Sequence, residues 1–246
     1  MRVVIVGGTG FIGGKLAGVL RERGHDVLQA GRSTGLDVVT GEGVAAAVAG
    51  ARVVVDLTTT RDFTPGAAAA FFTAAGRNLL AAEAEAGVAH HLPLSIVGVD
   101  RMADSDYMRG KLAQEEQIRA GRVPYTILRA TQFFEFLPAI AEGAADGDTV
   151  RLPGVAFQPI AGDDVAALVA DAVEAEPTGG TVDVAGPDRA PLHELVARSL
   201  AARGDRRKVI ADPAAGYFGA RVVADEMVPA GPARLGATHL TDWLAR

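Results

Sequence analysis

MRVVIVGGTGFIG, the stretch of residues 1–13, decides the fold of this chain. Its β-branched run from Val3 to Val6 is typical of a buried strand. Glycines follow at positions 7, 10 and 13, and apolar residues then recur on one face from Phe11 to Arg23, which predicts a helix that ends at Gly24. A strand that runs through a glycine loop into a helix is the first half of a βαβ unit.

The rest of the chain repeats this alternation of short β-branched runs and longer alanine-rich stretches. Strands are predicted at 25–30, 52–57, 89–97, 125–129 and 182–184, and helices at 43–49, 67–86, 105–120, 133–145, 163–174, from Pro191 onward and around Trp243. This order favours an α/β fold, a Rossmann-type doubly wound parallel sheet with a small carboxyl-terminal substrate lobe. We expect a single domain over 1–246. Because the alternation loosens near Ala130, we expect this domain to have a core of about 1–130 plus 149–175 and a lobe of about 131–148 and 176–246.

The composition narrows the classes of function. The chain has 246 residues, enough for a sizeable core, and its formal net charge of −6 offers no general attraction to nucleic acid or to an anionic membrane. It has no Cys, which excludes thiolate metal sites and a Cys nucleophile, and the adjacent His90 and His91 would point to opposite faces of a strand. We therefore expect a small-molecule substrate, no nucleic acid, no membrane, no metal, a cytoplasmic location, and a monomer or homodimer.

The glycine loop is suited to hold a pyrophosphate. A tight turn, close approach of backbone N–H groups to an anion, and a helix that points its positive end at that anion all favour glycine at these positions. The spacing G-x-x-G-x-x-G departs from the commonest dinucleotide motif, G-x-G-x-x-G, and the alternative interpretation is a strand-to-helix turn without a ligand. The candidate cofactor-binding residues of the loop are Gly7, Thr9, Gly10, Phe11, Ile12 and Gly13.

Arg32 follows the second predicted strand, where the 2′ position of the ribose of a bound dinucleotide would lie. An acidic residue at that point accepts hydrogen bonds from the 2′-hydroxyl of NAD, whereas an arginine favours the 2′-phosphate of NADP. After Arg32 no acidic residue occurs until Asp37, so the sequence favours NADP as the cofactor, with NAD as the alternative. Arg32 could otherwise be an ordinary solvated loop residue.

Tyr107 and Lys111 lie four residues apart at the start of a predicted helix. Side chains at this spacing share a helix face, so the phenol and the ammonium can point into one pocket. A neighbouring cation favours the phenolate and lowers the pKa of a tyrosine toward the range of a general acid. The alternative is a surface pair without a chemical role.

These residues resemble the short-chain dehydrogenase/reductase superfamily, in particular its atypical NmrA-like branch of NAD(P)H-binding proteins. The resemblance covers most of the chain and rests on residues 7–13, 107–116, 124–129 and 159–166. It implies that Thr9 to Ile12 hold the pyrophosphate, Arg32 and Ser33 the 2′-phosphate, Asp37 and Val38 the adenine, Thr58 and Thr59 the ribose, and Lys111 the nicotinamide ribose. It also implies a third catalytic hydroxyl near the end of the strand before Tyr107, where Ser95 is available.

Gln132, Phe133 and Phe134 come just past a predicted strand, at the edge where open α/β sheets bind their substrates. Three of the nine Phe residues lie within 133–136, which indicates contact with an apolar or aromatic substrate. Packing of a helix against the core would explain these aromatic residues equally well.

The expected function is an NADP-dependent oxidoreductase that reduces a small carbonyl or quinone-like compound, with catalytic residues Tyr107, Lys111 and Ser95. Tyr107 would protonate the developing alkoxide, Lys111 would lower the pKa of Tyr107, and Ser95 would orient the substrate oxygen. One alternative is a non-catalytic NADP(H)-binding redox sensor. Another is a sugar-nucleotide epimerase or dehydratase, for which the basic residues at 203–208 would have to hold a diphosphate.

Overall fold

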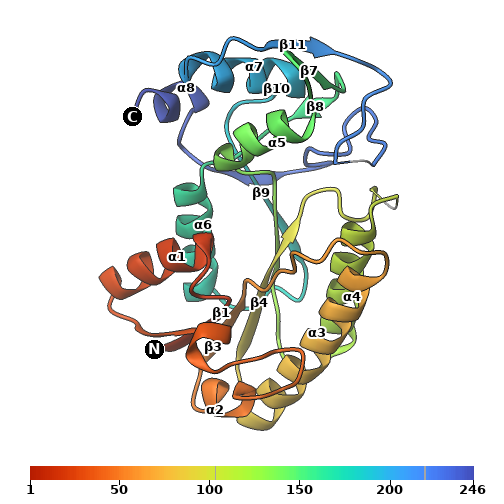
Figure 1. Cartoon of the computed structure of the whole chain (residues 1–246). Helices are drawn as coiled ribbons and strands as arrows, with labels where there is room; N and C mark the ends of the chain where they lie inside the picture. Colours follow the sequence, from red (N-terminus) through yellow and green to blue (C-terminus); the bar gives the residue numbers. More distant parts are fainter. Residues whose placement is uncertain (103, 219) are drawn as a thin grey trace.

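The computed structural model describes residues 1–102, 104–218 and 220–246. At its centre is a seven-stranded sheet in the order β12-β9-β5-β4-β3-β1-β2, and each pair of neighbouring strands is parallel (Figure 1). The strands are β1 (Arg2–Val6), β2 (Asp26–Ala30), β3 (Val53–Asp56), β4 (His90–Ile96), β5 (Ile127–Ala130), β9 (Thr181–Ala185) and β12 (Ala233–Leu235). This arrangement confirms the predicted doubly wound parallel sheet.

Helices cover both faces of the sheet, which explains why the central strands β1 and β3 are apolar on both sides. They are α1 (Phe11–Glu22), α2 (Val44–Val48), α3 (Ala67–Ala86), α4 (Asp106–Ala120) and α6 (Gly162–Glu174). Side chains alternate along a strand, so Val3 and Ile5 of β1 pack with α1 and α6, whereas Val4 and Val6 pack with α2 and α3. β1, which is buried from Val3 to Val6, therefore holds the two helical layers together.

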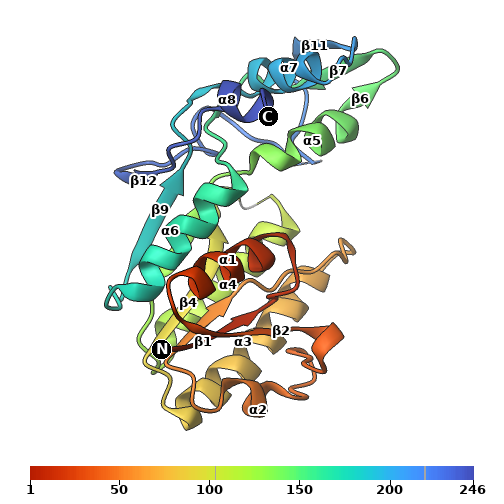
Figure 2. The ribbon, with the colours of Figure 1, turned by 90° about the vertical axis from the view of Figure 1, so that its left-hand side faces the viewer.

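The carboxyl-terminal lobe is built from short elements. It contains the 3₁₀ turn Phe134–Phe136, α5 (Leu137–Gly143), α7 (Leu192–Ala202), α8 (Leu240–Leu244), the three-stranded sheet of β6 (Ala145–Asp146), β7 (Thr149–Leu152) and β11 (Lys208–Ala211), and the pair β8 (Ala156–Phe157) and β10 (Ala190–Pro191). The chain enters the lobe from the carboxyl ends of β5 and β9. The lobe consequently stands beyond the carboxyl edge of the central sheet (Figure 2).

The boundary between core and lobe differs from the expected one in two places. β9 and β12, which lie within the stretch 176–246 expected in the lobe, extend the central sheet. β7, expected in the core with 149–175, instead pairs with β11 in the lobe. Both differences arise because a strand is placed by hydrogen bonds to a partner distant in the chain, and the local pattern of apolar residues does not name that partner.

Most predicted elements agree with the structure to within a residue or two. The main difference lies at 133–145, predicted as one helix, where a 3₁₀ turn precedes α5 and Pro138 lies in the first turn of α5. A proline is tolerated there because the first N–H groups of a helix have no partner within it. In the part of the chain that the structure describes, no helix has the length and apolar content needed to cross a bilayer.

Candidate active site

The candidate site lies at the point where the order of the strands in the sheet reverses. β1 lies between β2 and β3, so the chain leaves β1 to one side first and later returns on the other side. Open α/β sheets bind ligands outside the carboxyl ends of their strands at such a point. The glycine loop follows β1 here, the loop to α3 follows β3, and the turn Arg32–Thr34 follows β2.

Backbone contacts explain why glycine is needed in the loop. Gly7 has φ of 80°, a backbone conformation that residues other than glycine rarely adopt. A Cβ on Gly8 would lie 2.6 Å from the carbonyl oxygen of Ile5, and one on Gly13 would lie 2.6 Å from the carbonyl oxygen of Gly7. The loop thus packs directly on the end of β1 and on the first turn of α1.

The amino terminus of α1 has the features of an anion site. Gly10 is its N-cap and offers no side-chain acceptor, so the N–H groups of the first turn are left for another partner. Thr9, Gly10 and Phe11 are exposed, while Ile12 and Gly13 are buried beneath them. Thr9, Gly10 and Phe11 therefore form the exposed surface of the loop, and the backbone N–H of Gly10 already donates to the carbonyl oxygen of Gly7 at 3.0 Å.

Residues for the adenosine half lie at the ends of β2 and β3. Arg32 and Ser33 are exposed in the turn directly after β2, and among the described residues no ion pair includes Arg32. Thr58, after β3, has a buried Oγ1 that no described residue contacts by a hydrogen bond. A buried hydroxyl without a partner is costly, so Thr58 is suited to bind a ligand.

The segment at Asp37 and Val38 is held by contacts of its own. Oδ1 of Asp37 accepts hydrogen bonds from the backbone N–H groups of Val39 and Thr40 at 2.7 and 3.2 Å, and Val38 is buried in the core. Asn78 of α3 donates to the carbonyl oxygens of Val38 and Val39 at 2.9 Å each. The predicted contact with adenine stays a prediction.

Tyr107 reaches the end of β3 from the first turn of α4. Its Oη and Oγ1 of Thr59 share a hydrogen bond of 2.8 Å. The rings of Phe72 and Phe63 lie 5.6 and 6.4 Å from the Tyr107 ring, centroid to centroid. Burial raises the pKa of Tyr107, and the hydrogen bond with Thr59 only partly opposes it. This direction is opposite to the one expected from a neighbouring lysine.

Lys111 is buried and has partners other than Tyr107. Its Nζ donates to the carbonyl oxygen of Leu94 at 2.8 Å and to Oε1 of Gln114 at 2.6 Å, and Gln114 in turn donates to Asp56 at 2.7 Å. Burial lowers the pKa of Lys111 to about 8, although Asp56 and Glu115 favour its charged form. The ammonium thus belongs to a polar chain that links α4 to β4 and β3, and its predicted contact with the nicotinamide ribose stays a prediction.

Ser95 lies in a buried ionic cluster between the sheet and α4. Ser95 is 2% exposed, and its hydroxyl donates to Glu115 at 2.5 Å. Glu115 also accepts two hydrogen bonds from Arg129, at 2.9 and 2.7 Å, and one from Arg119 at 2.7 Å. Ser95 therefore has a structural partner here, and the described contacts do not bring it to Tyr107.

Replacing Glu115 should destabilise the fold, because it would leave Arg129 without its main buried partner. We expect Glu115→Gln to lower the free energy of unfolding by about 2 kcal/mol. The neighbouring Glu116→Gln is the control, since Glu116 is exposed and should change stability by less than about 0.5 kcal/mol. Chemical denaturation of both variants at neutral pH measures the difference, and equal stabilities would contradict a structural role for the cluster.

The same cluster predicts a dependence on acid. Burial alone would raise the pKa of Glu115, but hydrogen bonds from Arg129, Ser95 and Arg119 outweigh it and hold the pKa below its ordinary value of 4.5. A carboxylate whose pKa is lower in the folded than in the unfolded protein stabilises the fold. This stabilisation is fully present above the pKa of the unfolded state and is lost as pH falls through the pKa of the folded state. The free energy of unfolding should therefore fall less steeply below pH 4.5 in Glu115→Gln than in the wild type.

The three predicted substrate residues lie in different surroundings. Phe134 is fully buried in the lobe, with its ring 5.6 Å from that of Trp243, and has no surface for a ligand. Phe133 is half-buried and stacks on Phe136 at 5.4 Å, and both rings lie 6.5 Å from that of Phe11 in the first turn of α1. Gln132 is half-buried and its carbonyl oxygen accepts from Ile160 at 2.9 Å. A partly exposed aromatic cluster thus borders the glycine loop.

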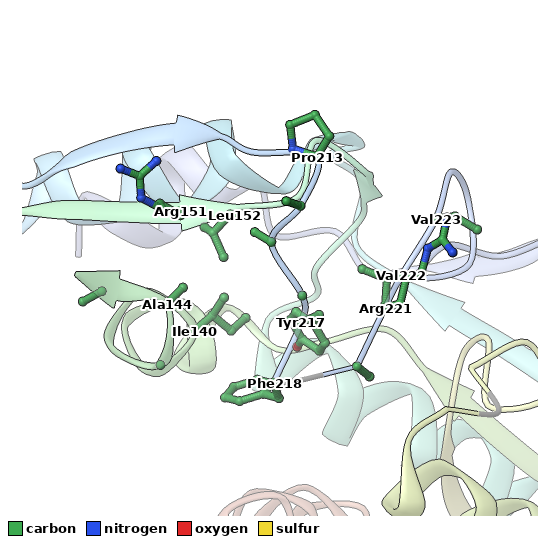
Figure 3. Close-up of a pocket in the computed structure, with 16 residues that line it drawn as sticks. Ile140, Ala144, Arg151, Leu152, Pro213, Tyr217, Phe218, Arg221, Val222 and Val223 are labelled. Atoms are coloured by element: carbon green, nitrogen blue, oxygen red, sulfur yellow. The ribbon is translucent and has the colours of Figure 1, made fainter.

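A cavity of about 760 Å³ lies in the lobe, between α5, β7 and residues 213–218 and 220–223 (Figure 3). Ile140 and Leu152 point toward one another across it, Tyr217 comes from the facing segment, and Arg151 and Arg221 lie at opposite sides. Two stretches some seventy residues apart in the chain form this cavity, so no local signal in the sequence could have indicated it. The contact between Thr59 and Tyr107 also joins two segments distant in the chain, so no local signal in the sequence could have indicated it either.

His90 and His91 do point in different directions, as predicted. His90 shares a hydrogen bond of 3.0 Å with Thr126, whereas His91 lies 2.9 Å from the buried carboxylate of Glu83. Over residues 1–102, 104–218 and 220–246, no group of three or more His, Asp or Glu side chains is arranged to hold a metal ion.

No protein-family model matches the chain, and no curated protein sequence does either. Solved structures do match it over almost its whole length. A short-chain dehydrogenase/reductase superfamily protein from Agrobacterium tumefaciens with bound NAD is 16% identical, with a TM-score of 0.76, over 100% of this chain and 95% of that one. MoeE5 in complex with UDP-glucose and NAD is 18% identical, with a TM-score of 0.78, over 100% of this chain and 96% of that one.

A third match is dTDP-4-dehydrorhamnose reductase from Bacillus anthracis in complex with NADP. It is 14% identical, with a TM-score of 0.73, over 98% of this chain and 92% of that one. At such low identity the likeness is one of fold. The chain has the fold of short-chain dehydrogenase/reductase proteins, which confirms the predicted fold class, while its place in the NmrA-like branch stays a prediction.

Proposed function

We propose that this protein is an oxidoreductase that binds NADP(H) and reduces a small carbonyl or quinone-like substrate. One observation carries the proposal: the hydrogen bond between Thr59 and Tyr107 holds a phenolic hydroxyl at the carboxyl end of β3. β3 is the neighbour of β1, whose carboxyl end carries the glycine loop. The proposed dinucleotide site and the proposed proton donor would therefore share one edge of the sheet.

The residues present fit a nicotinamide dinucleotide. The glycines let the loop pack closely on the end of β1, and the N-cap of α1 has no side-chain acceptor for the backbone N–H groups of the first turn. Among the described residues, none forms a hydrogen bond with the buried hydroxyl of Thr58. Arg32 would pair with a 2′-phosphate, which favours NADP. Structures of the same fold with bound NAD and with bound NADP support this class of cofactor. When bound, the reduced cofactor supplies a hydride.

This chain's own residues would hold the substrate and deliver a proton. Tyr107 would donate its phenolic proton to the substrate oxygen as the carbonyl is reduced. The aromatic cluster of Phe11, Phe133 and Phe136 would contact an apolar or aromatic substrate beside the glycine loop. The lobe stands on the same side of the sheet, and its cavity has room for the unreactive part of a substrate.

Titration of the purified protein with NADPH and with NADH tests the cofactor. We expect tighter binding of NADPH, and we expect Arg32→Ala to weaken NADPH binding by about 10- to 100-fold, since a charged hydrogen bond to phosphate is lost, with NADH binding unchanged. Arg52→Ala is the matched control, because Arg52 is also exposed but precedes β3 at the opposite edge of the sheet. If both variants bind NADPH like the wild type, Arg32 does not select the cofactor.

A second candidate function is a redox sensor that binds NADP(H) without turnover. The observation in its favour is that Lys111 and Ser95 are both engaged by buried partners instead of by Tyr107. A panel of carbonyl and quinone compounds, with NADPH consumption followed by absorbance, separates the two functions. Consumption with any of them supports the oxidoreductase, and tight NADPH binding without consumption across the panel supports the sensor.

A further inference from the structure

The hydroxyl of Tyr107 is oriented by the loop that follows β3. Its Oη lies 2.8 Å from Oγ1 of Thr59. Phe63 from the same loop and Phe72 from α3 contact its ring, the latter edge to face at 82°. The contacts on the ring and on the oxygen together hold the Tyr107 oxygen beside the Thr59 hydroxyl.

Lys111, by contrast, is separated from this hydrogen bond. Its Nζ is held by Leu94 and Gln114, and it lies 4.8 Å from the centre of the Phe72 ring. The same Phe72 ring packs against Tyr107. An aromatic ring thus contacts both the ammonium and the phenol, and no described hydrogen bond joins the two.

Two carboxylates of these segments, Asp62 and Asp106, also have partners. Asp106, next to Tyr107 in the chain, pairs with Arg109 at 2.9 Å and accepts from the backbone N–H of Gly66 at 3.0 Å. Asp62, in the loop after β3, accepts from Oγ1 and N–H of Thr64. The Thr59 hydroxyl reaches the Tyr107 oxygen at 2.8 Å, and its other acceptor, the carbonyl oxygen of Thr60, is more distant at 3.5 Å.

A phenol that gives its proton to a substrate oxygen is left as a phenolate, which needs a hydrogen-bond donor nearby. We propose that Thr59 is a positioning residue that orients the Tyr107 hydroxyl and donates a hydrogen bond to the phenolate, a role that Lys111 does not fill. The inference rests on the proposed function, in which the substrate oxygen accepts the proton. The experiment below is chosen so that the role of Thr59 and the proposed function can each fail without the other.

The test is a titration of Tyr107 itself. The protein is prepared with 3,5-difluorotyrosine, whose phenol is more acidic than that of tyrosine, and is followed by ¹⁹F NMR across pH. Tyr107→Phe identifies the Tyr107 signal among those of the three tyrosines. Thr59→Val, which keeps the shape but removes the hydroxyl, should move the titration of Tyr107 upward by about one pH unit. Thr59→Ser should restore it.

Lys111→Met supplies the comparison, and we expect it to move the titration less than Thr59→Val does. A larger shift in Lys111→Met, or no shift in Thr59→Val, would overturn the inference. If Lys111→Met does not fold, the Thr59→Val and Thr59→Ser pair decides alone. If the protein consumes NADPH but Thr59→Val does not move the titration of Tyr107, the proposed oxidoreductase is supported and the role of Thr59 is refuted. If the titration moves but no NADPH is consumed, the role of Thr59 is supported and the proposed activity is refuted.

Discussion

Tyr107→Phe should lower the rate of NADPH-dependent reduction by about 100- to 10,000-fold, the usual contribution of a positioned general acid. The change removes one oxygen and keeps the ring, whose packing against Phe72 and Phe63 should hold the loop after β3 in place. Affinity for NADPH should therefore stay within about twofold of that of the wild type, because the predicted pyrophosphate and 2′-phosphate contacts are elsewhere. Steady-state kinetics and a binding titration measure the two quantities separately.

Tyr125→Phe is the matched control for this variant. Tyr125 is also partly buried, but it precedes β5, at the end of that strand opposite the glycine loop. We expect its turnover to equal that of the wild type. If Tyr107→Phe turns over every substrate of the panel at the wild-type rate, Tyr107 is not the proton donor, and water or another group takes that role.

Gly13→Ala should strongly weaken cofactor binding and destabilise the fold. The added Cβ would lie 2.6 Å from the carbonyl oxygen of Gly7 and from two backbone atoms of Gly8. Backbone atoms cannot turn aside as a flexible side chain can, so α1 must move away from the end of β1. We expect NADPH affinity to fall by about 100-fold or more and the free energy of unfolding to fall by about 3 kcal/mol.

The next residue offers a sharp control. A Cβ on Gly14 would meet no other atom within 4 Å, although the two glycines are adjacent in the same helix. Gly14→Ala should keep NADPH affinity and raise the free energy of unfolding by up to about 1 kcal/mol, because alanine favours a helix over glycine. Denaturation and NADPH titration of both variants make the comparison. Similar behaviour of the two would mean that the close approach at Gly13 does not hold the loop.

Local patterns were sufficient for most of the fold. The β-branched run at 3–6 became β1, and the helix predicted at 67–86 has the observed bounds, ending at a Gly87 with φ of 69°. The short strands of the lobe were harder, because β7 and β11 are held by a partner nearly sixty residues away in the chain. Such strands carry little pattern of their own, and their pairing depends on where the rest of the chain has already folded.

Some features of the candidate site could likewise be predicted from local sequence, whereas others depend on tertiary contacts. The glycine loop and the turn at Arg32 follow directly from strands, so their position at the edge of the sheet could be predicted from the order of elements. The spacing of Tyr107 and Lys111 predicted that both would lie on one face of a helix, but not which atoms each side chain would reach. The tertiary structure directs Lys111 to Leu94 and Gln114, and Tyr107 to Thr59.

The sequence by itself thus determined the class of fold, the loop suited to a pyrophosphate and the segments that meet at the carboxyl edge of the sheet. These follow from residue spacing, backbone freedom and burial, which are properties of short stretches. Only the tertiary structure decided the partners of Tyr107, Lys111 and Ser95 and the shape of the cavity in the lobe. Buried polar groups must each find a hydrogen-bond partner, and which partner is within reach depends on packing between segments far apart in the chain.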